Sequence, residues 1–211
     1  MKHILCYGDS NTWGYDADTD ARFPFEQRWT GRLSALLPAD YRIIEEGLCG
    51  RTTSYELPLE PDRNGYAAYP AALSSADPID LVVLMLGTND RRAQLIVSPE
   101  ESALALERYI LFTRTPQHWL GHQTPQILLV SPPEIAPGVV HTNAGFYYNQ
   151  TSVEHSKRLK SVYVKLANQY QCAFLDAAAY CAPGEDQIHF SADGHTRLAD
   201  AMARKIREIL I

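Results

Sequence analysis

Short apolar runs alternate with longer stretches of mixed polarity along this chain. Five runs rich in aliphatic and β-branched residues predict strands, at residues 4–7, 42–45, 81–86, 127–130 and 173–175. The run 81–86 is apolar at every position, which is typical of a strand that is buried on both faces. We therefore expect parallel strands in a sheet that helices cover on both sides.

Helix signals fall in the intervals between these runs. Ser98 suits an N-cap, Pro99 suits the first helical position, and Glu101 completes a capping box ahead of an apolar-periodic stretch. Helical spacing recurs at residues 153–170 and 192–210. With right-handed crossovers, these elements predict an α/β fold, a three-layer α/β/α sandwich around a five-stranded parallel sheet. Because no repeat, low-complexity tract or linker divides the sequence, we expect one domain over residues 1–211.

The composition is ordinary for a soluble globular protein, with 45% apolar and 21% charged residues among 211. No apolar run approaches the ~18 residues of a membrane span, and the N-terminus has too few apolar residues for a signal peptide. We therefore expect a cytoplasmic protein without a membrane partner. The formal net charge of −6, without a cluster of Lys and Arg, argues against nucleic acid as a partner.

Four cysteines lie far apart in the sequence and form no C-x-x-C pair: Cys6, Cys49, Cys172 and Cys181. A reducing compartment keeps such residues as thiols. Cys49 lies in a glycine-rich loop, but no His or Asp lies near it in sequence to activate the thiol. A cysteine nucleophile is therefore a weaker hypothesis than a serine.

Three short strings supply the parts of a serine-dependent acyl transfer site. Gly-Asp-Ser ends at Ser10, Gly-Thr-Asn-Asp contains Asn89, and Asp186 precedes His189 by three residues. A neutral hydroxyl needs a base to take its proton, and fixed donors must receive the negative charge that develops on the carbonyl oxygen. Ser10, Gly50 and Asn89 follow the first three predicted strands, so we expect them to meet at the carboxyl edge of the sheet, where such folds bind ligands. Each string alone is weak evidence, and their order and placement carry the argument.

This combination resembles the SGNH hydrolases, the GDSL-type esterase and lipase superfamily, over essentially the whole chain. The resemblance implies the SGNH hydrolase fold and a catalytic triad of Ser10, His189 and Asp186. It also implies three donors of an oxyanion hole, which are the backbone N–H groups of Ser10 and Gly50 and the side-chain amide of Asn89.

Several further strings look like the arylesterase and acyltransferase branch of that superfamily, at residues 6–10, 28–31, 45–48, 51–53 and 130–133. The resemblance implies hydrolysis of short-chain acetyl or aryl esters, acyl transfer to alcohols in water, and a homo-oligomer. Asn11 stands where the GDSL name has Leu, which changes the polarity beside the nucleophile. We expect Asn11 and Trp13 to contact a small-molecule ester substrate.

The residue roles follow from the chemistry of acyl transfer. His189 takes the Ser10 proton as the acyl carbonyl is attacked, and it returns that proton to the leaving alcohol. Asp186 fixes the imidazole tautomer and stabilises its charged form. This mechanism needs neither a metal nor a cofactor.

Other interpretations of the same residues stay open. Ser10 could serve only as a helix N-cap, and Asn89 with its neighbour could be only a turn former. Asp9 is favoured as a structural acceptor for loop N–H groups. His195 rivals His189 as the base, but it lacks an Asp at the matching spacing.

Aromatic side chains in two loops are candidates for the substrate pocket. One loop follows Ser10 and carries Trp13, Tyr15, Phe23 and Phe25, and a Pro/Gly-rich segment ends with Phe146, Tyr147 and Tyr148. Packing within their own loops or at a subunit contact is the alternative. Trp13 is the preferred pocket residue.

Two pairs of basic residues have both a functional and a structural interpretation. Arg91 and Arg92 follow Asn89 and could meet an anionic substrate, but solvated surface charge is favoured. His118 and His122 have the i, i+4 spacing of a metal pair. Surface histidines are favoured there, because the residues between them include no Glu and the segment lies between prolines.

Two classes of function remain. The first is a serine esterase that works through an acyl-enzyme, with a carbohydrate O-deacetylase or a thioesterase of the same fold as variants. The second is a non-catalytic flavodoxin-like module that binds a small ligand or a partner at the same edge. Loss of ester turnover on replacing Ser10 would select the first.

Overall fold

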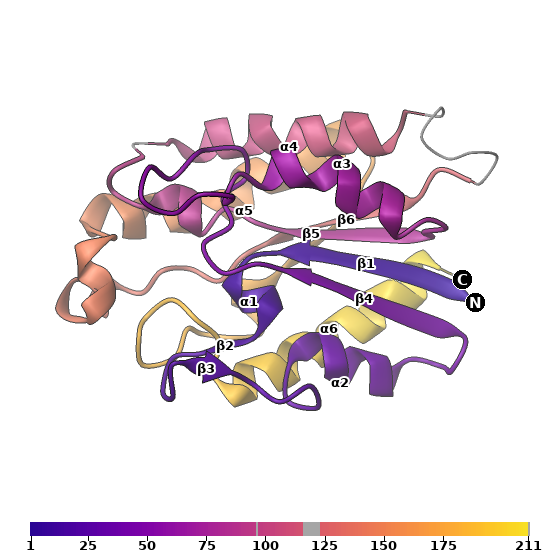
Figure 1. Ribbon diagram of the computed structural model, residues 1–211, viewed down its shortest axis with the longest axis horizontal. Coiled ribbons are helices and arrows are strands. Elements are labelled where there is room, and N and C mark those ends of the chain that lie inside the picture. Colours follow the sequence, from indigo (N-terminus) through magenta and orange to yellow (C-terminus); the bar gives the residue numbers. More distant parts are fainter. Residues whose placement is uncertain (96, 116–122, 211) are drawn as a thin grey trace.

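The computed structural model describes residues 1–95, 97–115 and 123–210, so His118 and His122 lie outside the described residues. Its centre is a five-stranded parallel sheet in the order β4-β1-β5-β6-β7 (Figure 1). The strands are β1 (Lys2–Gly8), β4 (Tyr41–Gly47), β5 (Leu81–Met85), β6 (Gln126–Ser131) and β7 (Ala173–Asp176). The predicted runs coincide with these strands to within two residues at either end, which confirms the predicted sheet.

Three neighbouring strands end level with one another at the carboxyl edge of the sheet. Gly8, the last residue of β1, pairs with Gly47 in β4 and with Met85 in β5. The segments that follow these strands therefore begin side by side, although they are far apart in the sequence.

Helices cover both faces of the sheet, as predicted. On one face lie α2 (Trp29–Leu36) and α6 (Ala192–Ile209), and on the other lie α3 (Gly65–Ser75), α4 (Pro99–Thr113) and α5 (Gln150–Gln169) (Figure 1). Alternate residues of β1 enter two separate cores. Ile4 and Cys6 pack with the first pair of helices, while Leu5 and Tyr7 pack with the other three. This double burial explains why the strand sequences are nearly continuously apolar.

The helix boundaries follow from capping residues. Ser98 caps α4, and Glu101 closes the predicted capping box. Asn149 caps α5 in a second box with Ser152, so this helix begins three residues before its predicted start. The predicted ends of α5 and α6 each lie one residue beyond the observed ends.

Several short elements that the apolar pattern did not predict lie along the connections between the strands and helices. They are α1 (Ser10–Trp13), the paired strands β2 (Tyr15–Asp16) and β3 (Ala21–Arg22), and the 3₁₀ turns η1 (Asn89–Arg91), η3 (Pro137–His141), η4 (Asn143–Phe146) and η5 (Ala177–Ala179). Such short segments show no helical or strand period. Within the described residues, no helix has both the length and the apolar character that crossing a membrane requires.

Candidate active site

Ser10 is the first residue of α1 and is separated from β1 by a single residue. That residue, Asp9, is the N-cap, and its Oδ1 accepts a hydrogen bond of 3.0 Å from the backbone N–H of Asn11. The interpretation of Asp9 as a structural acceptor is confirmed, and the helix does not need Ser10 as a cap. Burial raises the pKa of Asp9 to about 6, although the hydrogen bond from Asn11 opposes the rise.

Ser10 Oγ lies 2.7 Å from His189 Nε2, although the two residues are 179 positions apart. His189 Nδ1 in turn contacts Asp186 Oδ2. Asp186 Oδ1 accepts hydrogen bonds from the backbone N–H groups of Ile188 at 3.0 Å and His189 at 2.9 Å. Burial alone would raise the pKa of Asp186, but the hydrogen bonds from His189 and Ile188 outweigh burial and hold the pKa below its ordinary value. The carboxylate is therefore ionised at neutral pH and orients the imidazole.

Ring packing also holds His189. The ring of Tyr15, in β2, lies with its centroid 4.6 Å from that of the imidazole, at an interplanar angle of 54°. The Tyr15 hydroxyl donates a hydrogen bond of 2.8 Å to Asp20 Oδ1, which anchors the tyrosine in its own loop. The segment that contains β2 and β3 therefore borders the triad.

Gly50 lies three residues beyond β4 with a φ of +78°, a conformation that favours glycine. An added Cβ would also approach Glu60 Oε2 to 3.0 Å. The next residue, Arg51, fixes this loop: Nη1 donates to the Gly8 carbonyl at 2.9 Å, and the guanidinium lies 4.0 Å from the centroid of the Tyr7 ring. The backbone around Gly50 is thereby tied to the end of β1.

Asn89 begins η1, and its side chain is held at both ends. Nδ2 donates to the Arg51 carbonyl at 3.1 Å, and Oδ1 accepts a hydrogen bond of 3.3 Å from the Tyr148 hydroxyl. An amide nitrogen carries two hydrogens, so one N–H remains for the cavity that Asn89 lines. Asp90 has a structural role, because it accepts hydrogen bonds from the Thr53 N–H at 2.8 Å and from the Thr53 hydroxyl at 2.7 Å.

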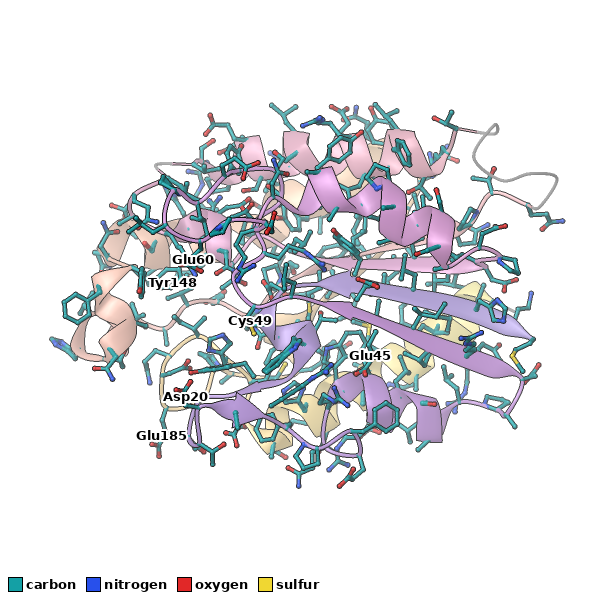
Figure 2. The ribbon with its side chains drawn as sticks, viewed as in Figure 1. Asp20, Glu45, Cys49, Glu60, Tyr148 and Glu185 are labelled. Carbon is teal, nitrogen blue, oxygen red and sulfur yellow. The ribbon has the colours of Figure 1, made fainter. Side chains whose placement is uncertain are left out.

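A cavity of about 680 Å³ joins these groups at the carboxyl edge of the sheet. All five residues predicted for the triad and the oxyanion hole line it: Ser10, Gly50, Asn89, Asp186 and His189. Figure 2 shows Glu60 and Tyr148 together on one side of this region, with Cys49 near the end of the sheet and Glu185 on the loop before α6. The sheet topology thus brings together residues from four distant segments.

Asn11 and Trp13 do not line this cavity, which corrects the expectation that they contact the substrate. Asn11 is buried, and its Oδ1 accepts a hydrogen bond of 2.9 Å from the backbone N–H of Phe190. Trp13 packs within its own loop, because Arg22 lies 4.9 Å from its ring centroid and donates to its carbonyl oxygen at 2.7 Å. The polar side chain of Asn11, beside Ser10, therefore forms its hydrogen bond within the protein.

The two aromatic loops do border the cavity, but through other residues than Trp13. Three tyrosines line it: Tyr15, Tyr147 and Tyr148. Phe23 is buried with its ring 5.1 Å from that of His195, whereas Phe25 and Phe146 are exposed. The expectation of pocket aromatics thus holds for the tyrosines and fails for the phenylalanines.

Arg91 and Arg92 are not solvated surface charges, contrary to the favoured expectation. Arg91 is 3% exposed and donates a hydrogen bond of 2.5 Å to Ser102 Oγ. Arg92 lines the cavity and pairs with Glu60. Its guanidinium lies 5.0 Å from the ring centroid of Tyr147.

One wall of the cavity is ionic and is formed by Glu60, Arg63 and Arg92. Glu60 makes a second contact of 3.4 Å with the Arg92 guanidinium, and Arg63 Nη1 donates to the Pro61 carbonyl at 3.1 Å. No motif marks Glu60 or Arg63 in the sequence. The sequence gives one indication that they border the site, which is their position in the long loop that follows the second predicted strand.

The two rivals of the triad residues, His195 and Cys49, do not suit the roles of base and nucleophile. His195 is fully buried, its Nδ1 accepts a hydrogen bond of 3.2 Å from the Trp29 N–H, and burial lowers its pKa to about 4. Cys49 lines the cavity, but burial raises the pKa of its thiol to about 11, so the thiol is protonated at neutral pH. All four cysteines are free. In the part of the chain that the structure describes, no group of three or more His, Cys, Asp and Glu side chains is arranged to hold a metal ion.

The chain is similar to known ester hydrolases in sequence and in structure. Residues 6–197 match the model of the GDSL-like lipase/acylhydrolase family. The chain is 36% identical to the solved structure of Est24, a carbohydrate acetylesterase from Sinorhizobium meliloti, with a TM-score of 0.91 over 100% of both chains. It is 35% identical to the native M. smegmatis aryl esterase, with a TM-score of 0.92 over 100% of both chains.

A more distant solved structure shares the fold. The lipase/acylhydrolase from Enterococcus faecalis is 21% identical, with a TM-score of 0.71 over 99% of this chain and 96% of that one. No curated protein sequence matches the chain.

Proposed function

Because the chain belongs to the GDSL-like lipase/acylhydrolase family and is a carboxylic ester hydrolase, we propose that it cleaves short-chain esters through an acyl-enzyme on Ser10. The observation that carries this proposal is the continuous contact from Asp186 through His189 to Ser10 Oγ. A serine hydroxyl becomes a strong nucleophile only as a base takes its proton, and His189 Nε2 lies within reach of that proton. A non-catalytic binding module has no use for this arrangement.

In acylation, Ser10 Oγ attacks the carbonyl carbon of the ester, and its proton passes to His189 Nε2. The tetrahedral intermediate collapses, the bond to the leaving oxygen breaks, and that oxygen takes the proton from His189. Water then attacks the acyl-enzyme while His189 accepts a water proton. The bond between the acyl group and Ser10 breaks, and the serine regains its proton. Asp186 stabilises the imidazolium in both halves.

We assign three N–H groups to the binding of the oxyanion of each tetrahedral intermediate. They are the backbone N–H groups of Ser10 and Gly50 and the Nδ2 group of Asn89, all on residues that line the cavity. Their segments begin at the level ends of β1, β4 and β5, so the donors are held before the substrate binds. Donors held in this way stabilise developing charge without reorganisation.

The ionic wall favours a polar alcohol part of the substrate. Hydroxyl groups exchange hydrogen bonds with carboxylates and guanidinium groups, whereas an apolar chain would bury Glu60, Arg63 and Arg92 without new partners. A carbohydrate O-acetyl ester is therefore the second candidate beside an aryl ester. The similar carbohydrate acetylesterase supports this choice. An alcohol that replaces water in the second half of the reaction would give acyl transfer by the same steps.

Hydrolysis of p-nitrophenyl acetate, butyrate and octanoate by the wild-type and Ser10→Ala proteins tests the proposal, together with mass spectrometry after treatment with an organophosphonate. We expect turnover to fall with chain length and to drop by as much as ~10⁶-fold in Ser10→Ala. We also expect a single adduct on Ser10. Turnover retained by pure Ser10→Ala protein, or an adduct on another residue, would contradict the acyl-enzyme.

A further inference from the structure

Tyr148 contacts the side chain that we assign to the oxyanion hole. Its hydroxyl donates a hydrogen bond of 3.3 Å to Asn89 Oδ1, and both residues are buried. Tyr148 lies between η4 and α5 and lines the cavity, as Glu60 does, and Figure 2 labels both residues on the same side of the molecule. The same loop is tied to the segment after Asn89, because the Ala93 N–H donates to the Tyr147 carbonyl at 2.8 Å.

The direction of the Asn89 amide matters because its two ends are not equivalent. Oδ1 only accepts hydrogen bonds and Nδ2 only donates them, and Nδ2 already donates to the Arg51 carbonyl at 3.1 Å. Rotating the amide by half a turn would place Oδ1 against the Arg51 oxygen and withdraw the N–H that faces the cavity. An oxyanion hole built on Asn89 therefore depends on the groups that fix this rotation.

The Tyr148 hydroxyl can fix the rotation because the atom that it contacts can only accept. A hydroxyl both donates and accepts, whereas an amide oxygen only accepts. The phenolic proton therefore points to Asn89 Oδ1 in the 3.3 Å hydrogen bond, and a rotated amide would place an N–H donor there instead. Arg92, which lines the same cavity, is held by Glu60.

We propose that Tyr148 is a positioning residue of the oxyanion hole, which holds the Asn89 amide with Nδ2 toward the cavity. The proposal rests on the proposed function, in which Asn89 stabilises the tetrahedral oxyanion. That charge develops only on the way to the intermediate, so a loosely held Asn89 lowers kcat and leaves KM nearly unchanged. Burial raises the pKa of Tyr148 to about 12, although Arg92 opposes the rise, so the phenol remains a donor at neutral pH.

Tyr148→Phe removes the hydroxyl and keeps the ring, and its kinetics with p-nitrophenyl acetate test the proposal. We expect kcat to fall about five- to tenfold, the range that one neutral hydrogen bond supplies, with KM within about twofold of the wild-type value. Tyr69→Phe is the matched control, because Tyr69 is also buried and its hydroxyl shares a hydrogen bond of 2.6 Å with Thr113, on the helix layer away from the cavity. That control should lose stability and keep its kcat.

The Asn89→Ala background separates positioning from a general structural effect. If Tyr148 acts through Asn89, Tyr148→Phe should lower kcat there by less than about twofold. An equal loss in both backgrounds, or no loss of kcat in either, would overturn the proposal. Ser10→Ala is measured in the same series: if it retains turnover, the acyl-enzyme fails whatever Tyr148 does. If Ser10→Ala is inactive and Tyr148→Phe has normal kcat, only the role of Tyr148 fails.

Discussion

Asn11 Oδ1 accepts a hydrogen bond of 2.9 Å from the backbone N–H of Phe190, which joins the residue after the proposed nucleophile to the residue after the proposed base. Both partners are buried, so water does not compete for this hydrogen bond. Ser10 and His189 lie on separate segments, and their contact of 2.7 Å needs those segments to keep a constant separation. The Asn11 side chain is a direct link between them.

Asn11→Leu should therefore lower both stability and turnover. Leucine has a similar volume but no acceptor, so the Phe190 N–H becomes a buried donor without a partner, at a cost of about 1–3 kcal/mol. We expect a lower midpoint of urea unfolding and a lower kcat with p-nitrophenyl acetate. Asn168→Leu, on the exposed side of α5, is the control for the substitution itself. An unchanged midpoint together with an unchanged kcat would show that the link is dispensable.

Asp186→Asn should preserve the fold and lower kcat by about 10³–10⁴-fold. The amide oxygen can still accept the backbone hydrogen bonds from Ile188 and His189. The amide nitrogen would then face His189 Nδ1 as a donor, which favours the tautomer with its proton on Nε2, pointing at Ser10. That tautomer cannot act as a base. Circular dichroism checks the fold and steady-state kinetics check the rate, and a loss below tenfold would mean that Asp186 does not orient the imidazole.

The apolar pattern predicts the layers of this fold because burial itself produces the pattern. The run 81–86 is apolar throughout, since β5 has neighbours on both faces and on both edges. The residues of the candidate triad could be found because Ser10 directly follows a strand and because Asp186 and His189 keep a short spacing. Their catalytic roles, a homo-oligomer and a cytoplasmic location stay predictions.

The cavity wall could not be predicted in the same way. The direction of Asn11 depends on Phe190, which is 179 positions away, so the local sequence does not tell whether this side chain faces the substrate. Arg92 forms an ion pair because the loop between β4 and α3 places Glu60 near the segment that follows β5. Ion-pair partners from distant loops therefore outweigh the usual tendency of arginine to be exposed to solvent.

The free energy of unfolding should depend on pH because His195 has a different pKa in the folded and unfolded chains. Burial lowers the pKa of this ring to about 4 from its ordinary 6.5. As the pH falls below 6.5, the unfolded chain binds a proton at this site and the folded chain does not, so the contribution favours unfolding until about pH 4. Between pH 7 and 4.5 this group alone should remove on the order of 2 kcal/mol of unfolding free energy.

Asp9 acts in the opposite direction, so the test must compare variants. The pKa of Asp9 is raised by burial to about 6 from 3.8, so the folded chain binds this proton first and gains stability as the pH falls through that window. His195→Asn removes one of the two effects, and its side-chain oxygen can accept the Trp29 N–H in place of Nδ1. We expect the unfolding free energy of the wild type minus that of His195→Asn to fall by on the order of 2 kcal/mol from pH 7 to 4.5 in urea titrations. A difference that stays constant would contradict a buried neutral ring.

Arg63→Ala should change the choice of alcohol and leave the acyl preference intact. Arg63 lines the cavity, and its Nη1 donates to the Pro61 carbonyl next to the ionic wall. We expect kcat/KM for a fully acetylated glucose to fall about five- to twentyfold and that for p-nitrophenyl acetate to stay within about twofold. Arg108→Ala is the control, since it removes the same charge from an exposed position of α4.

The ratio of kcat/KM for acetylated glucose to kcat/KM for p-nitrophenyl acetate isolates the effect of Arg63→Ala on the alcohol part of the substrate. Both esters carry an acetyl group, so contacts on the acyl side and any partial loss of folded protein cancel in the ratio. Only a contact with the alcohol part can change it. A ratio that Arg63→Ala leaves at the wild-type value would contradict the assignment of this wall to the alcohol. The charged side chains would then serve to hold the loop around Gly50, where a Cβ would already approach Glu60 and Arg63 to within 3.2 Å.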